Sequence, residues 1–78
     1  MSLVLQSLWY DAKGDWEKAH NLISDLETPE NNLIHAYLHR KEGDASNAAY
    51  WYRRASQPVC RAPLDAEWEA IVRVFLSR

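Results

Sequence analysis

The amino-acid sequence predicts an all-α protein, and three observations support this class. Apolar residues recur every three or four positions along most of the chain, which is the period of an amphipathic helix. No stretch alternates apolar and polar residues for long enough to form a strand. The two glycines and three prolines lie between the periodic segments, where helices begin or end. We therefore expect about five helices, over residues 2–13, 15–27, 30–42, 44–56 and 64–77.

Two glycine–aspartate pairs predict the turns inside two helical hairpins. Gly14-Asp15 follows the first periodic segment, and Gly43-Asp44 follows the third. A glycine readily adopts the left-handed conformation that ends a helix, and an aspartate caps the N-terminus of the next helix. We expect both glycines to have positive φ.

The segments beyond these turns carry apolar stripes at helical spacing. The second segment carries the stripe Trp16, Ala19, Leu22, Ile23 and Leu26. The third opens at Thr28-Pro29, a cap residue followed by a proline at the first helical position. The fourth has a stripe of smaller residues that lets a neighbour approach closely, made of Ala45, Ala48, Tyr52 and Ala55. The last follows Pro63 and carries Trp68, Ile71, Val72 and Phe75.

The first four segments form an internal repeat. A shift of 29 residues places the first Gly-Asp pair on the second, Ala19 on Ala48 and Ile23 on Tyr52. We predict one domain over residues 1–78, with repeat one at about 2–28, repeat two at about 30–57 and a terminal helix at about 64–77. The expected architecture is a short right-handed α-solenoid of two helical hairpins, with the C-terminal helix capping the open end of the second.

Both repeats resemble the tetratricopeptide repeat family. The stretch WYDAKGDWEKAHNLISDLETPENN is similar to the family pattern through Tyr10, Gly14, Asp15, Trp16, Ala19, Ile23 and Pro29. The stretch HAYLHRKEGDASNAAYWYRRA is similar through Ala36, Gly43, Asp44, Ala48, Tyr52 and Ala55. Its end, AAYWYRRA, also resembles the related Sel1-like repeat. The resemblance implies a small non-enzymatic module that binds a peptide or protein partner, or itself.

The same resemblance implies a concave face formed by the first and third helices. On this face we expect the partner-binding residues Leu8, Asp11, Leu33, Tyr37, Arg40 and Lys41. The apolar members would form a floor, and the two cations would bind an acidic side chain or a free carboxylate of a peptide. The alternative is that these are solvated helix residues without a ligand.

Composition narrows the function classes. Nine Lys plus Arg against eleven Asp plus Glu give a net charge of −2, whereas nucleic-acid-binding modules are usually strongly basic. No apolar run approaches the length of a membrane span, and the start lacks the features of a secretion signal. The single cysteine, Cys60, fits a reducing compartment, and we expect a cytoplasmic protein. Two repeats bury little core, so a two-fold homodimer is expected.

The spacing of two histidines raises the question of a metal site. His35 and His39 lie four positions apart, one helical turn, as in zinc proteases, but Ala36 stands where such enzymes carry the glutamate base. The other soft ligand candidates are His20 and Cys60. We therefore predict histidines that pack within the hairpin, with no metal or other cofactor. A metal-dependent or hydrolase-like site on His35, His39 and an acid is the alternative.

A second alternative involves the aromatic and basic residues of the fourth helix. The segment from Tyr50 to Arg54 could stack and neutralise a single-stranded nucleic acid. We instead predict that its cations complement the helix dipole. Tyr50 and Trp51 could form a protein interface, or Trp51 could pack under the terminal helix. The sequence leaves these two possibilities open.

Overall fold

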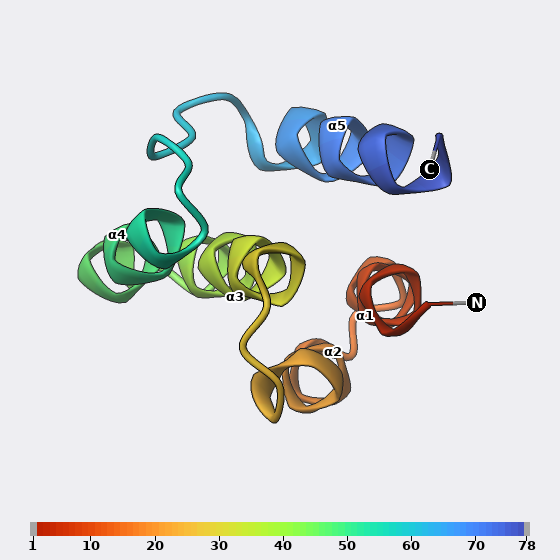
Figure 1. Ribbon diagram of the computed structural model, residues 1–78. Helices are drawn as coiled ribbons and strands as arrows, with labels where there is room; N and C mark the ends of the chain where they lie inside the picture. The colour runs from red at the N-terminus through yellow and green to blue at the C-terminus, as the bar shows by residue number, and fades with distance from the viewer. Residues whose placement is uncertain (1, 78) are drawn as a thin grey trace.

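The computed structural model describes residues 2–77, and within them it contains five α-helices and no strand (Figure 1). The helices are α1 (Leu3–Ala12), α2 (Trp16–Ser24), α3 (Pro29–Lys41), α4 (Ala45–Arg54) and α5 (Leu64–Leu76). The predicted all-α class is confirmed. Each helix lies inside a predicted segment, except that α3 begins one residue earlier than predicted.

The turns that follow α1 and α3 have the same hydrogen-bonding pattern. Gly14 and Gly43 have φ values of +87° and +91°, so the prediction of positive φ is confirmed. The amide of Asp15 donates to the carbonyl of Tyr10, and the amide of Asp44 donates to the carbonyl of His39, each at 2.9 Å. These bonds complete the helix C-terminal motif that needs a left-handed residue.

Both aspartates also begin the following helix as predicted. The Asp15 side chain accepts a hydrogen bond from the Lys18 amide, and the Asp44 side chain accepts one from the Asn47 amide. At the start of α3, Thr28 caps the helix by accepting from the amide of Asn31, directly before Pro29. These three caps are local features, and the sequence predicted each of them.

Helix α2 ends at Ser24, three residues before the predicted end at 27. Beyond this end, Nδ2 of Asn31 donates to the carbonyl of Leu26 at 2.8 Å and to that of Ile23 at 3.4 Å. These bonds satisfy carbonyl groups that another helical turn would have used. Asn31 thereby fixes the connection between the two hairpins.

The core lies between the hairpins and under α5. Helix α1 packs on α2, α3 packs on α4, and α2 packs on α3, which joins the hairpins. The main cluster of buried apolar side chains comes from α1, α2, α3 and α5: Val4, Leu8, Ala19, Ile23, Ile34, Tyr37, Leu38 and Ile71. A smaller cluster inside the second hairpin consists of Ala36, Ala48 and Tyr52.

The position of α5 differs from the prediction. We expected this helix to cap the open end of the second hairpin, but it lies across α1 and α3 (Figure 1) and reaches α4 through the hydrogen bond between Glu67 and Tyr52. Its apolar stripe, which includes Trp68 and Ile71, packs in the main core. This position buries more apolar surface because both hairpins contribute to that core. The right-handed solenoid stays a prediction.

Candidate functional site

The predicted concave face is covered by α5. Leu8, Asp11 and Tyr37 expose only 1%, 2% and 3% of their surface. Above them, the indole Nε1 of Trp68 donates to the Leu8 carbonyl at 3.1 Å. Trp68 therefore occupies part of the surface where the resemblance placed a bound peptide.

The polar residues of this face bind one another. The Tyr37 hydroxyl donates to Oδ2 of Asp11 at 2.9 Å, and Nζ of Lys41 lies 2.8 Å from Oδ1 of the same carboxylate. Burial, together with the neighbouring Asp11 carboxylate, raises the pKa of Tyr37, so its hydroxyl remains a proton donor. Asp11 and Lys41 thus form part of the protein's own packing.

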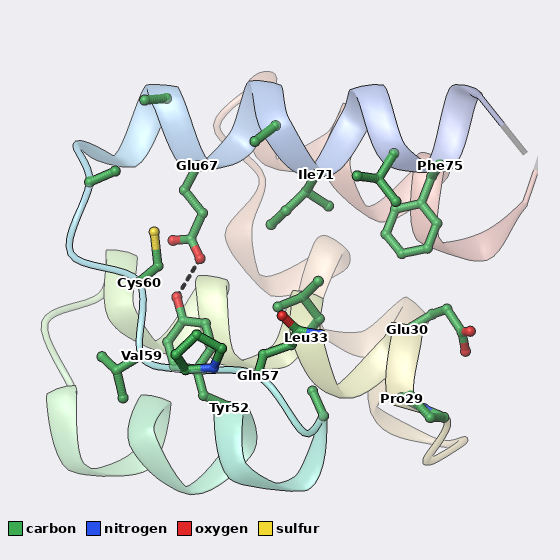
Figure 2. Close-up of a pocket in the computed structure, with 16 residues that line it drawn as sticks. Pro29, Glu30, Leu33, Tyr52, Gln57, Val59, Cys60, Glu67, Ile71 and Phe75 are labelled. Atoms are coloured by element: carbon green, nitrogen blue, oxygen red, sulfur yellow. Dashed lines mark hydrogen bonds between the residues drawn. The ribbon is translucent and has the colours of Figure 1, made fainter.

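Arg40 is also engaged by other residues of the protein, in α5 and in the loop before it. Its Nη1 lies 2.7 Å from Oε1 of Glu67, which is 5% exposed, and its Nη2 donates to the carbonyl of Ala62. The second oxygen of Glu67 accepts a hydrogen bond from the Tyr52 hydroxyl (Figure 2). The hydrogen bond to Glu67 is the main reason that the pKa of Arg40 is raised. Arg40 therefore links α3 to α5 and to the loop before it.

An apolar groove of about 460 Å³ lies on the other side of these contacts, between α5 and the second hairpin (Figure 2). Of the predicted partner-binding residues, only Leu33 lines it. Three segments supply the remaining walls: the ends of α3 and α4, the connection after α4, and one side of α5. Their lining residues are Pro29, Glu30, Tyr52, Ala55, Gln57, Pro58, Val59, Cys60, Ala62, Ala66, Glu67, Ala70, Ile71, Val74 and Phe75.

Sequence reasoning did not find this groove. The sequence does show a row of alanine and valine residues along one side of the terminal helix, where Ala66, Ala70 and Val74 recur every four residues. Such spacing identifies one side of a helix, but it does not identify the other segments that this side faces. Only the position of α5 across α1 and α3 turns these small residues into a groove wall.

Tyr50 and Trp51 occupy different environments. Tyr50 is 43% exposed, whereas Trp51 is half-buried and stacks on His35 at 3.9 Å between ring centroids. Trp51 therefore packs against α3, not under the terminal helix. Arg54 lies over both aromatic rings, at 5.6 and 5.8 Å from their centroids, and also forms an ion pair with Glu27 in the connection between α2 and α3.

The three histidines of the chain form one cluster. His20 of α2 joins His35 and His39 of α3, with one ligand nitrogen of each ring within 4.8 Å of the other two. Nε2 of His20 and Nε2 of His35 are 2.9 Å apart. His35 and His39 therefore pack within the second hairpin and also contact His20 of the first. The spacing in the sequence did not identify His20 as the third member of this cluster.

Two tryptophans enclose this histidine cluster. Trp16 stacks on His20 at 4.9 Å, and its Nε1 donates to the Leu38 carbonyl at 2.7 Å. Trp51 covers the outer face of His35. His35 and His39 are 7% and 8% exposed, while His20 is half-buried at the edge of the cluster.

Burial and mutual repulsion favour the neutral form of two of these rings. Desolvation, followed by the neighbouring His20 and His39, lowers the pKa of His35 to about 4. Desolvation is also the main reason that the pKa of His20 is lowered, with His39 as the next cause. Both imidazoles are consequently neutral at pH 7 and keep a nitrogen lone pair.

The chain was compared with family models, curated proteins and solved structures. No family model, no curated protein and no solved structure matches it. Within residues 2–77, none of the helices has the length and apolar character required to cross a membrane.

Proposed function

We propose that the protein is a small tetratricopeptide-like interaction module without enzymatic activity, and that it binds an apolar segment of another protein. The observation that carries this proposal is the groove between α5 and the second hairpin. Most of its lining side chains are apolar, and several of them are exposed, as expected of a surface that another chain covers.

The framework around the groove supports a preformed binding surface. Glu67 at its base is neutralised by Arg40 and bonded to the Tyr52 hydroxyl. No buried side-chain nitrogen or oxygen among the described residues lacks a hydrogen-bond partner. A partner can therefore cover this base without leaving a buried charge unpaired.

The character of the groove wall favours an apolar occupant. Val59 and Val74, on opposite walls, are 43% and 48% exposed, and the small side chains of Ala66 and Ala70 leave room beside α5. Burying apolar surface of this kind favours binding by about 25 cal/mol per Å² before the costs of association. We propose a partner segment that inserts two or more apolar side chains between these walls.

Filling the groove tests the proposal. Ala70→Trp places a large ring at an exposed groove position, and Ala45→Trp makes the same change at the far end of α4, outside the groove. Affinity capture from the source cells is expected to recover a specific partner with the wild type and with Ala45→Trp, but not with Ala70→Trp. Circular dichroism checks that both variants remain folded. Equal capture by all three proteins would contradict a binding site in the groove.

A second copy of the chain is the competing occupant, since a homodimer was expected from the sequence. Sedimentation equilibrium of the wild type and of Ala70→Trp distinguishes the two cases. A dimer that Ala70→Trp dissociates would assign the groove to self-association instead of to another protein. A wild-type mass of 9.1 kDa at high micromolar concentration leaves the groove free for another protein.

A further inference from the structure

The sequence led us to predict no metal, but the histidine cluster has the donor set of a transition-metal site. All three histidines of this 78-residue chain contribute to it, although they come from two different helices. Imidazole nitrogen is a preferred ligand of zinc, copper, nickel and iron. Zinc can be held by three protein ligands with water in the fourth position, an arrangement otherwise found in catalytic sites.

The cluster brings three ligand nitrogens to within 4.8 Å of one another. Two zinc–nitrogen bonds of about 2.0–2.1 Å at a tetrahedral angle place their nitrogens about 3.3 Å apart. The Nε2 atoms of His20 and His35 are 2.9 Å apart, so they need to separate by only a few tenths of an ångström. The ligand atom of His39 lies within 4.8 Å of both.

The proton on His39 is already placed for ligation. Its Nδ1 lies 2.6 Å from Oε1 of Glu42, and a carboxylate can only accept, so Nδ1 carries the proton. In the neutral ring the lone pair then lies on Nε2, the nitrogen that can bind an ion. A carboxylate that holds the second nitrogen of a ligating histidine is the usual outer partner in zinc sites.

The other two rings need only one proton rearrangement. In the present hydrogen bond, one of the two Nε2 atoms of His20 and His35 donates and the other accepts. Binding of an ion requires both lone pairs, and the donating ring supplies its own by moving its proton to Nδ1.

We propose that His20, His35 and His39 bind one Zn²⁺ ion, with Glu42 orienting His39 and water completing the coordination on the exposed side of His20. The ion joins α2 to α3 and therefore holds the two hairpins together. This proposal is independent of the groove, because no groove residue belongs to the cluster.

The alternative acidic ligand set contains His39, Glu42 and Asp44. The Asp44 carboxylate is already engaged as the cap of α4, where it accepts from the amide of Asn47 and from the Ser46 hydroxyl. Exposed acidic groups such as that of Glu42 are common without an ion, whereas three clustered imidazoles are the nitrogen ligands that zinc prefers.

Isothermal titration of ZnCl₂ into chelator-treated protein tests the site. We expect one ion per chain, a micromolar or tighter dissociation constant, and a rise of several degrees in Tm. His20→Phe keeps a ring against Trp16 but removes a ligand, and it should weaken zinc binding at least tenfold. Cys60→Ser removes the only thiol and should leave binding unchanged. Absence of zinc binding by the wild type, or equal binding by His20→Phe, would overturn the proposal.

Two further measurements keep the test decisive if His20→Phe does not fold. Glu42→Gln leaves all three imidazoles in place, and it should weaken binding by about tenfold through the lost carboxylate partner. In the wild type, Zn²⁺ should shift the ¹⁵N resonances of all three imidazoles in an NMR titration. Imidazole resonances that do not respond to Zn²⁺ would refute the site without any substitution.

Discussion

At the scale of single residues, two buried carboxylates join the helices: Asp11 links α1 to α3, and Glu67 links α5 to the second hairpin. Asp11 and Glu67 are 2% and 5% exposed, and each accepts a hydrogen bond from a tyrosine hydroxyl and pairs with a cation. A buried carboxylate is costly unless its oxygens are satisfied. The partners of Glu67 lie on α3 and α4, so a shifted α5 would leave its charge uncompensated.

The tyrosine bonded to Asp11 provides a test of this pairing. Tyr37→Phe removes one partner of a buried carboxylate, and we expect it to lower the free energy of unfolding by about 1–2 kcal/mol. Tyr50→Phe is the matched control, because Tyr50 is exposed, and it should change stability by less than about 0.5 kcal/mol. Urea denaturation measures both. Equal effects of the two substitutions would show that the Asp11 bond contributes nothing.

The histidine cluster predicts a pH dependence of stability for chelator-treated protein. His35 has a pKa of about 4 in the folded chain and an ordinary value of 6.5 when unfolded. Between these values the unfolded chain binds the extra proton, so stability is full above pH 6.5 and falls as the pH drops toward 4. His20 and His39 face this ring, and Glu42 lies beyond His39.

Urea midpoints at pH 7.5 and pH 5 measure this effect. The wild type should lose stability over the interval, and His35→Phe, which keeps a ring beside Trp51 but cannot titrate, should lose less. If both proteins lose the same stability, protonation of His35 does not oppose folding.

At the scale of helices and turns, three C-termini end with the same hydrogen-bonding motif but different residues. Gly14 and Gly43 occupy the left-handed position after α1 and α3, while Ser56 occupies it after α4 with φ of +58°. The amide of Gln57 donates to the carbonyl of Tyr52 there, as in the other two turns. A side chain at this position is strained, and glycine relieves the strain.

Opposite substitutions at two of these turns should have opposite signs. Gly43→Ala is expected to cost about 1 kcal/mol through left-handed strain alone, because an added Cβ meets no atom within 4 Å. Ser56→Gly should stabilise by about 0.5 kcal/mol, since removal of that strain outweighs the added flexibility of the unfolded chain. Thermal denaturation gives both signs. A destabilised Ser56→Gly would contradict the motif after α4.

These turns also show what the sequence could predict. Gly14 and Asp15 act within one turn of chain, so their residue types indicate both the end of α1 and the start of α2. The stripe of Trp68 and Ile71 predicted which side of α5 is buried. It did not predict that this side packs on α1 and α3. His20 was named as a candidate ligand, but its place beside His35 and His39 was not predicted, because helical spacing does not say which neighbouring helix a side chain faces.

At the scale of the whole molecule, α5 is part of the core. It lies over Leu8 and Tyr37, and its Glu67 neutralises Arg40 of α3. Two hairpins alone would expose this apolar floor together with the polar groups of Asp11 and Tyr37. The fold therefore depends on both repeats and the terminal helix.

Removal of α5 should abolish cooperative folding. A chain ending at Ala62 loses the apolar cover of α1 and α3, and a small domain has little stability to lose. We expect a broad urea transition without a folded baseline, compared with a single sharp transition for the full chain. A truncated chain that unfolds as sharply as the full one would show that α5 is dispensable.

The proposal that a partner binds in the groove depends on the closure of the α1–α3 face by α5, and one NMR measurement tests this closure directly. The indole Hε1 of Trp68 should give nuclear Overhauser effects to Leu8, because Nε1 donates to the Leu8 carbonyl at 3.1 Å. Ile71 should give effects to residues of the same buried cluster. Absence of all contacts between α5 and α1 in the folded protein would contradict the closed face and return Leu8, Asp11 and Tyr37 to the surface available to a partner.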